Sequence, residues 1–448
     1  MKYIVAFCCI CILLTISACA STAPAASPAP AVEAPPNPTD SATTAGDLDE
    51  VTPAAPAETA TEPIIPSTEL PPTLEIEATT FNETFGGKGR DRGINLLQTR
   101  DGGYAIVGYT SSLGAGQEDV YLVRTDSLGQ ALWSATYGGE GSDNGWAVIE
   151  TEDGGFLIVG FSNSSGAGEM DIYLVRTDAA GNMLWEQTYG GPRSEYGWAM
   201  AQTADGGYVL AGQSNSFGEG QEDGYLVKVN AQGEEIWSQT FGGPEEDRLF
   251  SIDLGANGGF ILSGTTRSFG AGNSGNRDSY LVKTDDSGAL EWAQIFGEGL
   301  DDVGHAVRQT DDGGYIVTGY TRSFDAENYD MWLIKTDEAG ISSWQTFYGG
   351  PGDDRTIYGE QTSDGGYILT GYTKNFGAVG WDVFLVKTDS SGDVTWHKTF
   401  GGPAEDTGYT ARQTSDDGFI LTGTTYSSGE GGGDMLLIKV SPDGEIIE

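Results

Sequence analysis

Cysteine and histidine are scarce in this 448-residue chain, and each scarcity excludes a kind of chemistry. All four cysteines (Cys8, Cys9, Cys11 and Cys19) lie within the first nineteen residues, so the rest of the chain has no disulfide, no thiolate metal ligand and no cysteine nucleophile. The two histidines, His305 and His397, fall in different copies and at different positions of the repeat described below. We therefore expect no catalytic residues, no cofactor and no metal site, and we predict that the protein is not an enzyme.

Positive charge is also scarce. The chain has 22 Lys and Arg against 66 Asp and Glu, which gives a net charge of −44. Such a field keeps a protein soluble and repels nucleic acid and anionic lipid headgroups. Nucleic acid is therefore excluded as a partner.

The longest apolar stretch, Ile4–Ile16, is too short to span a membrane comfortably. It follows Lys2 and ends in Ile16-Ser17-Ala18-Cys19, a run that resembles a bacterial lipobox, in which the cysteine is lipidated (a palmitate-labelled anchor) and becomes the first mature residue. Residues 1–19 are thus expected to be a lipoprotein-type signal peptide, with simple secretory cleavage near Ala20 as the alternative. Either reading predicts export. The lipoprotein reading predicts an anchor at the cell membrane or outer membrane, facing the periplasm or the extracellular space.

Residues 20–75 contain twelve of the seventeen prolines and no Lys or Arg. A segment rich in Pro, Ala and Thr cannot bury enough apolar area to order itself. We expect a disordered, semi-stiff tether that could reach on the order of 100 Å.

Residues 76–448 are built from one repeat of about 52 residues that occurs seven times. Its signature is Asp-Gly-Gly, then Tyr or Phe, three apolar residues and Gly. The second glycine of the signature falls at Gly103, Gly155, Gly207, Gly259, Gly314, Gly366 and Gly418.

One copy, Gly349–Phe400, reads as four short strands bounded by Gly, Asp and Ser turns, with no convincing helical period. Seven such copies predict an all-β fold, a seven-bladed β-propeller of four-stranded antiparallel blades. The seventh copy stops before its last strand, and Phe81–Phe85 matches Trp396–Phe400 of the sixth copy. The N-terminal strand, Thr79–Phe85, is therefore expected to close the last blade and remove a free sheet edge.

Three positions recur in every copy. We interpret Trp133 and its equivalents, with Phe81 as the seventh, as wedges between blades. We interpret Asp119 and its equivalents, at the start of the third strand, as caps of tight turns, with a ring of cation ligands as the alternative. The basic residue five positions later, Arg124 in the first copy, is expected to form a solvated or inter-blade charge row. Acidic residues before the first strand, such as Asp143, predict a strongly acidic face on the side of the ring that also carries the loops before the third strand.

One position near the start of the first strand varies between copies, with Ile94 and Ile357 among its seven residues. Variation within a regular repeat makes this position the best candidate for a specific binding surface, with inter-blade packing as the alternative. The candidate residues are Trp146, Trp198, Phe250, His305 and Tyr409.

The strand–turn–strand run from Phe384 to Gly402 resembles the blade motif of quinoprotein-type propellers. The whole repeat is similar to those of bacterial and archaeal surface β-propeller proteins with repeats of the DGGYILTG type. The quinone dehydrogenases of that superfamily have eight blades, and many carry an adjacent-cysteine disulfide at the cofactor. Residues 76–448 have neither feature, so no cofactor residues are carried over.

A closer functional parallel is the lipoprotein propeller of the outer-membrane barrel-assembly machinery, a scaffold. The resemblance implies a non-catalytic, membrane-anchored binding or scaffold propeller with a protein partner at the cell envelope. The alternative is a lectin-like protein that binds a glycan through Trp146, Trp198, Phe250 and Tyr409. A hydrolase or quinoprotein-type enzyme is the reading that the sequence supports least.

Overall fold

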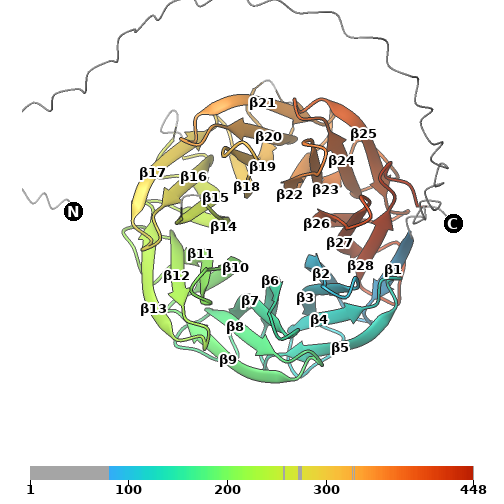
Figure 1. Cartoon of the computed structure of the whole chain (residues 1–448), viewed down its shortest axis with the longest axis horizontal. Helices are drawn as coiled ribbons and strands as arrows, with labels where there is room; N and C mark the ends of the chain where they lie inside the picture. Colours follow the sequence, from blue (N-terminus) through green and yellow to red (C-terminus); the bar gives the residue numbers. More distant parts are fainter. Residues whose placement is uncertain (1–79, 256–257, 271–274, 325, 327, 447–448) are drawn as a thin grey trace, which may run out of the picture. The chain divides into compact units, whose positions relative to one another are not determined.

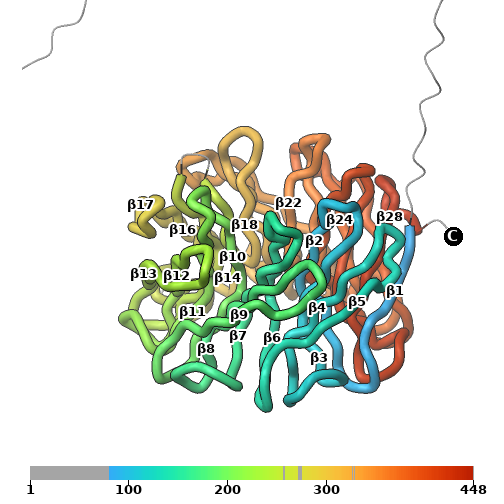
Figure 2. Tube along the Cα trace, turned by 60° about the horizontal axis from the view of Figure 1, so that its bottom comes forward, coloured from blue at the N-terminus to red at the C-terminus, as the bar shows by residue number. Residues whose placement is uncertain are grey.

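The computed structural model describes residues 80–446 with the exception of 256–257, 271–274, 325 and 327. Within the described residues, 28 strands form seven four-stranded antiparallel sheets. The sheets are arranged as blades around a central axis, and the first strand of each blade lies nearest to that axis (Figure 1). Figure 2 shows the strands running between two faces of the ring, with loops at both faces. The protein is a seven-bladed β-propeller, as the repeat predicts.

Six blades take their strands in chain order from the axis outward, and the seventh takes β26, β27 and β28 followed by β1. The innermost strands are β2 (Asp91–Gln98), β6 (Asp143–Glu150), β10 (Glu195–Gln202), β14 (Asp247–Leu254), β18 (Asp302–Gln309), β22 (Asp354–Gln361) and β26 (Asp406–Gln413). The second strands are β3 (Tyr104–Thr110), β7 (Phe156–Ser162), β11 (Tyr208–Ser214), β15 (Phe260–Thr266), β19 (Tyr315–Thr321), β23 (Tyr367–Thr373) and β27 (Phe419–Thr425). The third strands are β4 (Asp119–Thr125), β8 (Asp171–Thr177), β12 (Asp223–Val229), β16 (Asp278–Thr284), β20 (Asp330–Thr336), β24 (Asp382–Thr388) and β28 (Asp434–Val440). The outer strands are β5 (Ala131–Tyr137), β9 (Met183–Tyr189), β13 (Glu235–Phe241), β17 (Leu290–Phe296), β21 (Ser342–Tyr348), β25 (Val394–Phe400) and β1 (Phe81–Phe85).

The first strand of the chain closes the ring. β1 pairs antiparallel with β28, with Phe81 opposite Lys439 and Phe85 opposite Met435. In blade 6 the same register places Trp396 opposite Lys387. The predicted closing strand is therefore confirmed. It begins at Phe81, and Thr79 lies outside the described residues.

The hydrophobic core lies between neighbouring blades. Every residue of β3 and β4 is buried, because both faces of each sheet pack against another sheet. In one such core, Leu157 and Leu174 of blade 2 pack against Leu210 and Val227 of blade 3. Burying each of these side chains contributes roughly 1.5–3 kcal/mol, which holds adjacent blades together without a disulfide.

The recurring tryptophan is a wedge between blades, as predicted. Trp133 of blade 1 lies 5.9 Å from Phe156 of blade 2, ring centre to ring centre. It also covers Gly181 of blade 2, where an added Cβ would lie 2.7 Å from the indole ring, so a larger residue does not fit. Phe81 makes the same contacts across the closure, at 5.9 Å from Tyr104 of blade 1.

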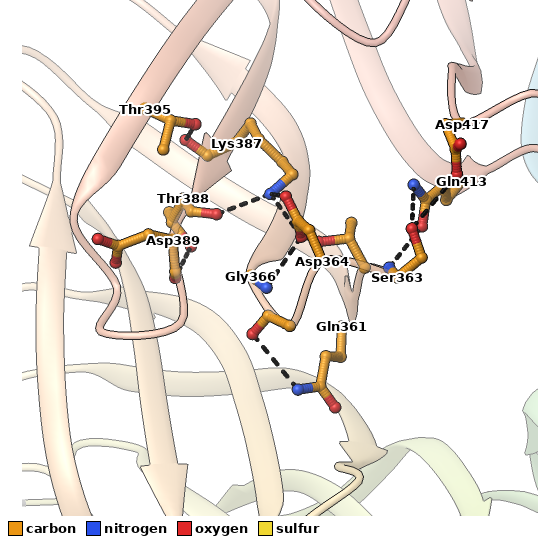
Figure 3. A network of polar contacts seen from close by, with 12 residues as sticks. Gln361, Ser363, Asp364, Gly366, Lys387, Thr388, Asp389, Thr395, Gln413 and Asp417 are labelled. Atoms are coloured by element: carbon orange, nitrogen blue, oxygen red, sulfur yellow. Dashed lines mark hydrogen bonds and ion pairs between the residues drawn. The ribbon is translucent and has the colours of Figure 1, made fainter. Parts of the chain in front are cut away.

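The recurring basic residue forms an ion pair inside its own blade. In blade 6 the Nζ of Lys387 lies 2.9 Å from Oδ2 of Asp364 and donates to the carbonyl of Thr388 at 2.8 Å (Figure 3). Asp364 is the aspartate of the Asp-Gly-Gly turn, and its Oδ1 accepts the Gly366 amide at 3.0 Å. Equivalent pairs join Arg124 to Asp101, Arg176 to Asp153, Lys228 to Asp205, Lys335 to Asp312 and Lys439 to Asp416. The expected solvated or inter-blade row is wrong, because each long side chain folds over its own turn.

The recurring carboxylates at the strand starts are buried caps. Asp119 accepts hydrogen bonds from the amides of Ala115 and Gly116 at 3.1 and 3.0 Å. Asp143, which is fully buried, accepts bonds from the Gly139 amide at 2.8 Å and the Ser164 hydroxyl at 2.6 Å. The turn-cap interpretation is therefore confirmed for Asp119. These carboxylates do not form the acidic face that the sequence predicted, because they turn inward to satisfy backbone amides.

Candidate functional site

A β-bulge interrupts the innermost strand of every blade at its fourth residue. In β2, Gly93 pairs with Gly108 and Asn95 pairs with Val107, so Ile94 lies between the paired positions. A bulge leaves one residue unpaired and redirects its side chain. The seven bulge residues are Ile94, Trp146, Trp198, Phe250, His305, Ile357 and Tyr409.

The bulge residues are the variable set identified in the sequence, and the structure brings them together. All seven line one cavity of about 250 Å³. Because they come from the seven innermost strands, which surround the axis in Figure 1, this cavity lies in the central channel. Its volume equals that of about eight waters, enough for one or two side chains of a partner. We call it the channel cavity.

Aromatic rings form one side of the channel cavity, over blades 2 to 5. The rings of Trp146 and Trp198 meet edge to face at 4.5 Å and 87°. Trp198 is also stacked on Tyr196, at 5.6 Å and 6°. Phe250 stacks on His305 at 5.0 Å. The rings hold each other in fixed orientations, so the wall is preorganised.

Two polar atoms in this wall differ in their partners. The indole nitrogen of Trp198 donates to Gln213 at 3.1 Å. The indole nitrogen of Trp146 is buried without a hydrogen-bond partner among the described residues. Burial lowers the pKa of His305 to about 4, so its ring is neutral at pH 7 and stacks on Phe250 as an uncharged group.

Arginine supplies the positive charge of the channel cavity, from blades 5 and 7. The guanidinium carbons of Arg308 and Arg412 lie 4.9 and 5.3 Å from the centre of the Tyr358 ring of blade 6. Both distances are within the range of a cation–π contact. The sequence analysis missed these three residues, which lie one to three positions beyond the bulge.

The charge of the channel cavity is opposite to that of the chain. Its lining includes two arginines and no aspartate or glutamate, in a protein with 66 acidic and 22 basic residues. Glu360, which is not part of the lining, lies 3.6 Å from Nη1 of Arg412. The cavity thus combines an apolar wall with a local positive charge.

A second cluster of rings and cations lies on blades 5 and 6. The guanidinium of Arg355, the second residue of β22, lies 4.5 Å from the Tyr329 ring centre and 5.7 Å from that of Trp381. Lys374 lies 4.2 Å from the Trp381 ring centre. None of these residues lines the channel cavity.

Catalytic chemistry finds little support in this geometry. His305 is neutral and its ring stacks on Phe250. No group of three or more His, Cys, Asp or Glu residues in the described part of the chain is arranged to hold a metal ion. What the cavity can do is bind, because its lining offers apolar area and guanidinium donors.

Comparison with known proteins adds little to this description. No protein-family model matches the chain. The regulatory protein FlaEY of Caulobacter vibrioides is 28% identical over 157 residues, a match that covers 30% of this chain and 16% of FlaEY. The chain therefore matches about a sixth of that relative's length.

Similar solved structures include a protein of unknown function from Dyadobacter fermentans (TM-score 0.44, 9% identity, 82% of this chain and 100% of that one). The WD40 domain of Neurospora crassa Pan2 has a TM-score of 0.46 at 9% identity, covering 83% and 99% of the two chains. A puromycin hydrolase has a TM-score of 0.45 at 14% identity, covering 76% and 51%. These values assign no function. The fold and the site themselves define a repeat β-propeller with an aromatic and cationic cavity in its channel.

Proposed function

We propose that this protein is a non-catalytic binding module that takes a short segment of a partner protein into the channel cavity. One observation carries the proposal: the positions that pack the blades recur in register, whereas the seven bulge residues that line the cavity are of five different types. Packing between equivalent blades needs equivalent residues. A site for one ligand needs the symmetry to be broken.

The packing of the indole rings favours a peptide over a sugar. A sugar stacks on an open aromatic face, but Trp146 and Trp198 meet edge to face and Trp198 is covered by Tyr196. Sugar hydroxyls are held mainly by carboxylate and amide side chains, and Asn95 is the only such side chain in the cavity lining. An apolar peptide side chain packed against the ring edges suits this wall better.

Capture from the native host tests the proposal. The immobilised propeller, residues 76–448, is expected to retain a protein partner from a cell-envelope extract, identified by mass spectrometry. The double variant Trp146→Ala, Trp198→Ala should lower the recovery at least tenfold, because buried aromatic anchors dominate binding energy. A matched control is Leu132→Ala, Leu184→Ala, which removes two exposed side chains of the outer strands.

Two results would contradict this function. Equal recovery by the channel variant and the wild type, with both folded by their melting temperatures, would exclude the channel cavity as the binding site. Specific glycan-array hits that the same channel variant loses would instead favour the carbohydrate-binding alternative.

We also propose that the protein is exported and lipid-anchored through Cys19, which lies outside the described residues, at the cell membrane or outer membrane. The lipobox-like run Ile16-Ser17-Ala18-Cys19 supports this. None of the described segments is a helix long and apolar enough to span a bilayer. Cys19→Ser should abolish palmitate labelling and release the protein from membranes, and Cys11→Ser should change neither. Labelling that survives in Cys19→Ser would contradict the anchor.

A further inference from the structure

The positive charge of the channel cavity is only partly neutralised by the protein itself. Arg308 uses one nitrogen, Nη1, to donate to the carbonyl of Val307 at 2.5 Å and to the hydroxyl of Ser251 at 3.2 Å. Among the described residues no carboxylate forms an ion pair with its guanidinium, although Asp253 and Glu360 lie near enough to raise its pKa. A guanidinium that borders a cavity without a carboxylate partner can form a charge-assisted, bidentate bond with an incoming anion.

The second arginine has a carboxylate neighbour that is already shared. Arg412 donates through Nε to the carbonyl of Leu96 at 2.9 Å, and its Nη1 lies 3.6 Å from Glu360. Glu360 also accepts the Tyr358 hydroxyl at 2.9 Å and the Gln413 amide at 2.8 Å. Glu360 therefore orients the arginine and leaves part of its charge for a ligand.

The spacing of the arginines and the aromatic wall limits the length of the peptide segment that can contact both. His305 and Arg308 are three residues apart on β18, so their Cα atoms are at most roughly 10 Å apart. One or two peptide residues span that distance.

We propose that the channel cavity recognises a carboxylate-bearing peptide segment, with an aromatic or long apolar side chain packed against the rings of Trp146, Trp198 and Phe250 and a carboxylate at Arg308 and Arg412. This inference rests on the proposed function and names the chemistry of its ligand. The carboxylate comes either from an Asp or Glu side chain or from a chain terminus, and the experiment below separates these two sources. In a protein of net charge −44, the cavity lining has two arginines and no aspartate or glutamate, which favours a carboxylate ligand at this site.

A synthetic library tests this proposal. Acetylated hexapeptides of random sequence are passed over the immobilised propeller in two arms, one with free C-terminal carboxylates and one with C-terminal amides. Retained peptides are expected to carry an apolar side chain within two residues of a carboxylate. Enrichment of Asp or Glu in the amide arm identifies a side-chain carboxylate. Peptides that are retained only in the arm with free C-termini identify a C-terminal carboxylate as the ligand.

Variants at the two arginines decide the interpretation. Arg308→Gln and Arg412→Gln should each lower the affinity for the retained peptides by about 10- to 100-fold, the loss expected for one charge-assisted hydrogen bond. Arg308→Lys should restore part of this affinity. The matched control is Arg248→Gln, an arginine of the innermost strand β14 that already pairs with Glu222 at 2.5 Å. Its peptide affinity should stay at the wild-type value. Melting temperatures establish that each variant is folded.

The possible failures are distinguishable. Retained peptides that are neutral or basic, or that bind Arg308→Gln and Arg412→Gln as tightly as the wild type, overturn the carboxylate inference. If the same peptides are lost in Trp146→Ala, Trp198→Ala, the channel cavity remains the binding site. If the wild type retains no peptide at all, the carboxylate inference fails, and capture of a partner from the native host still tests the proposed function. Retention of peptides that is equal in the wild type and the channel variant counts against the proposed function itself.

Discussion

Tryptophan occupies two kinds of position in this propeller, between blades and in the central channel, and the two kinds differ in periodicity. Trp133 has an equivalent in every blade, with Phe81 as the seventh, and each of these rings covers a glycine of the next blade. Trp146 and Trp198 stand at a bulge position that holds isoleucine, phenylalanine, histidine or tyrosine in the other blades. In a molecule built from equal repeats, the recurring residue reports on packing and the varying residue marks the candidate site.

The largest effect is expected where the periodic scaffold closes. Deleting residues 76–86 removes β1, exposes the edge of β28 and takes away the wedge Phe81, so the domain should aggregate or fail to fold. Size-exclusion chromatography and thermal unfolding measure this. Phe81→Trp is the matched control, because tryptophan fills this position in the other six blades. A deletion variant that elutes as a monomer with an unchanged melting temperature would refute the closure.

Truncating one tryptophan of each kind compares the two regions directly. Trp133→Ala should lower the free energy of unfolding by about 3–5 kcal/mol, because it leaves a void between two blades. Trp146→Ala should cost on the order of 1 kcal/mol, because it only enlarges a cavity that is already there. Chemical denaturation of both variants measures the difference. Equal losses would mean that Trp146 is also a packing residue.

Carboxylates of the scaffold should respond to pH in opposite directions. Burial and the neighbouring Asp354 raise the pKa of Asp330 to about 6. A raised pKa means that the stability Asp330 contributes is fully present below about pH 4 and is lost as the pH rises through 6. Asp330→Asn should therefore stabilise the propeller by on the order of 1 kcal/mol at pH 7 and have little effect at pH 4.

The exposed turn aspartates should behave in the reverse way. Hydrogen bonds from Thr151 and Arg176 hold the pKa of Asp153 at about 2, so the stability it contributes is present above about pH 4 and is lost as the pH falls through 2. Because Asp153 is largely exposed, Asp153→Asn should cost less than about 1 kcal/mol at pH 7. Thermal unfolding between pH 2 and 8 measures both variants. Parallel pH profiles for the two would contradict the assignment.

The smallest effect is expected at a departure from the repeat. Asp417 stands where six other copies have glycine, and it adopts a φ of 62°. A side chain in the left-handed region is strained, so Asp417→Gly should stabilise the propeller by about 0.5–1 kcal/mol. The hydrogen bond that Asp417 accepts from Ser363 at 3.3 Å reduces the gain (Figure 3). A destabilised variant would show that this bond outweighs the strain.

The sequence predicts the fold well because the repeat specifies it. The seven copies, the wedge at Trp133 and the closing strand at Phe81 all follow from comparing copies, and the structure confirms them. Burial of the strand-start carboxylates was not predicted, because the sequence pattern of an aspartate in a turn is the same whether its carboxylate faces solvent or accepts bonds from nearby backbone amides.

The channel cavity could be predicted only in part. The variable position locates Trp146 and its equivalents, but strict alternation along the strand would turn Arg308 and Arg412 away from His305 and Tyr409. The bulge resets that alternation, so the residue three positions beyond it also borders the cavity. One signal was present: glycine precedes the bulge residue in five of the seven innermost strands, and an isolated glycine in a strand often marks a bulge.

Site-specific photo-cross-linking in the native host tests the central claim most directly. p-Benzoylphenylalanine placed at position 250, in the channel cavity, is compared with the same amino acid at position 132, on the outer rim. The account predicts a partner-protein adduct from position 250, mapped by mass spectrometry to a short segment with an apolar residue beside a carboxylate, and no adduct with that partner from position 132. Adducts from the rim position alone would contradict it.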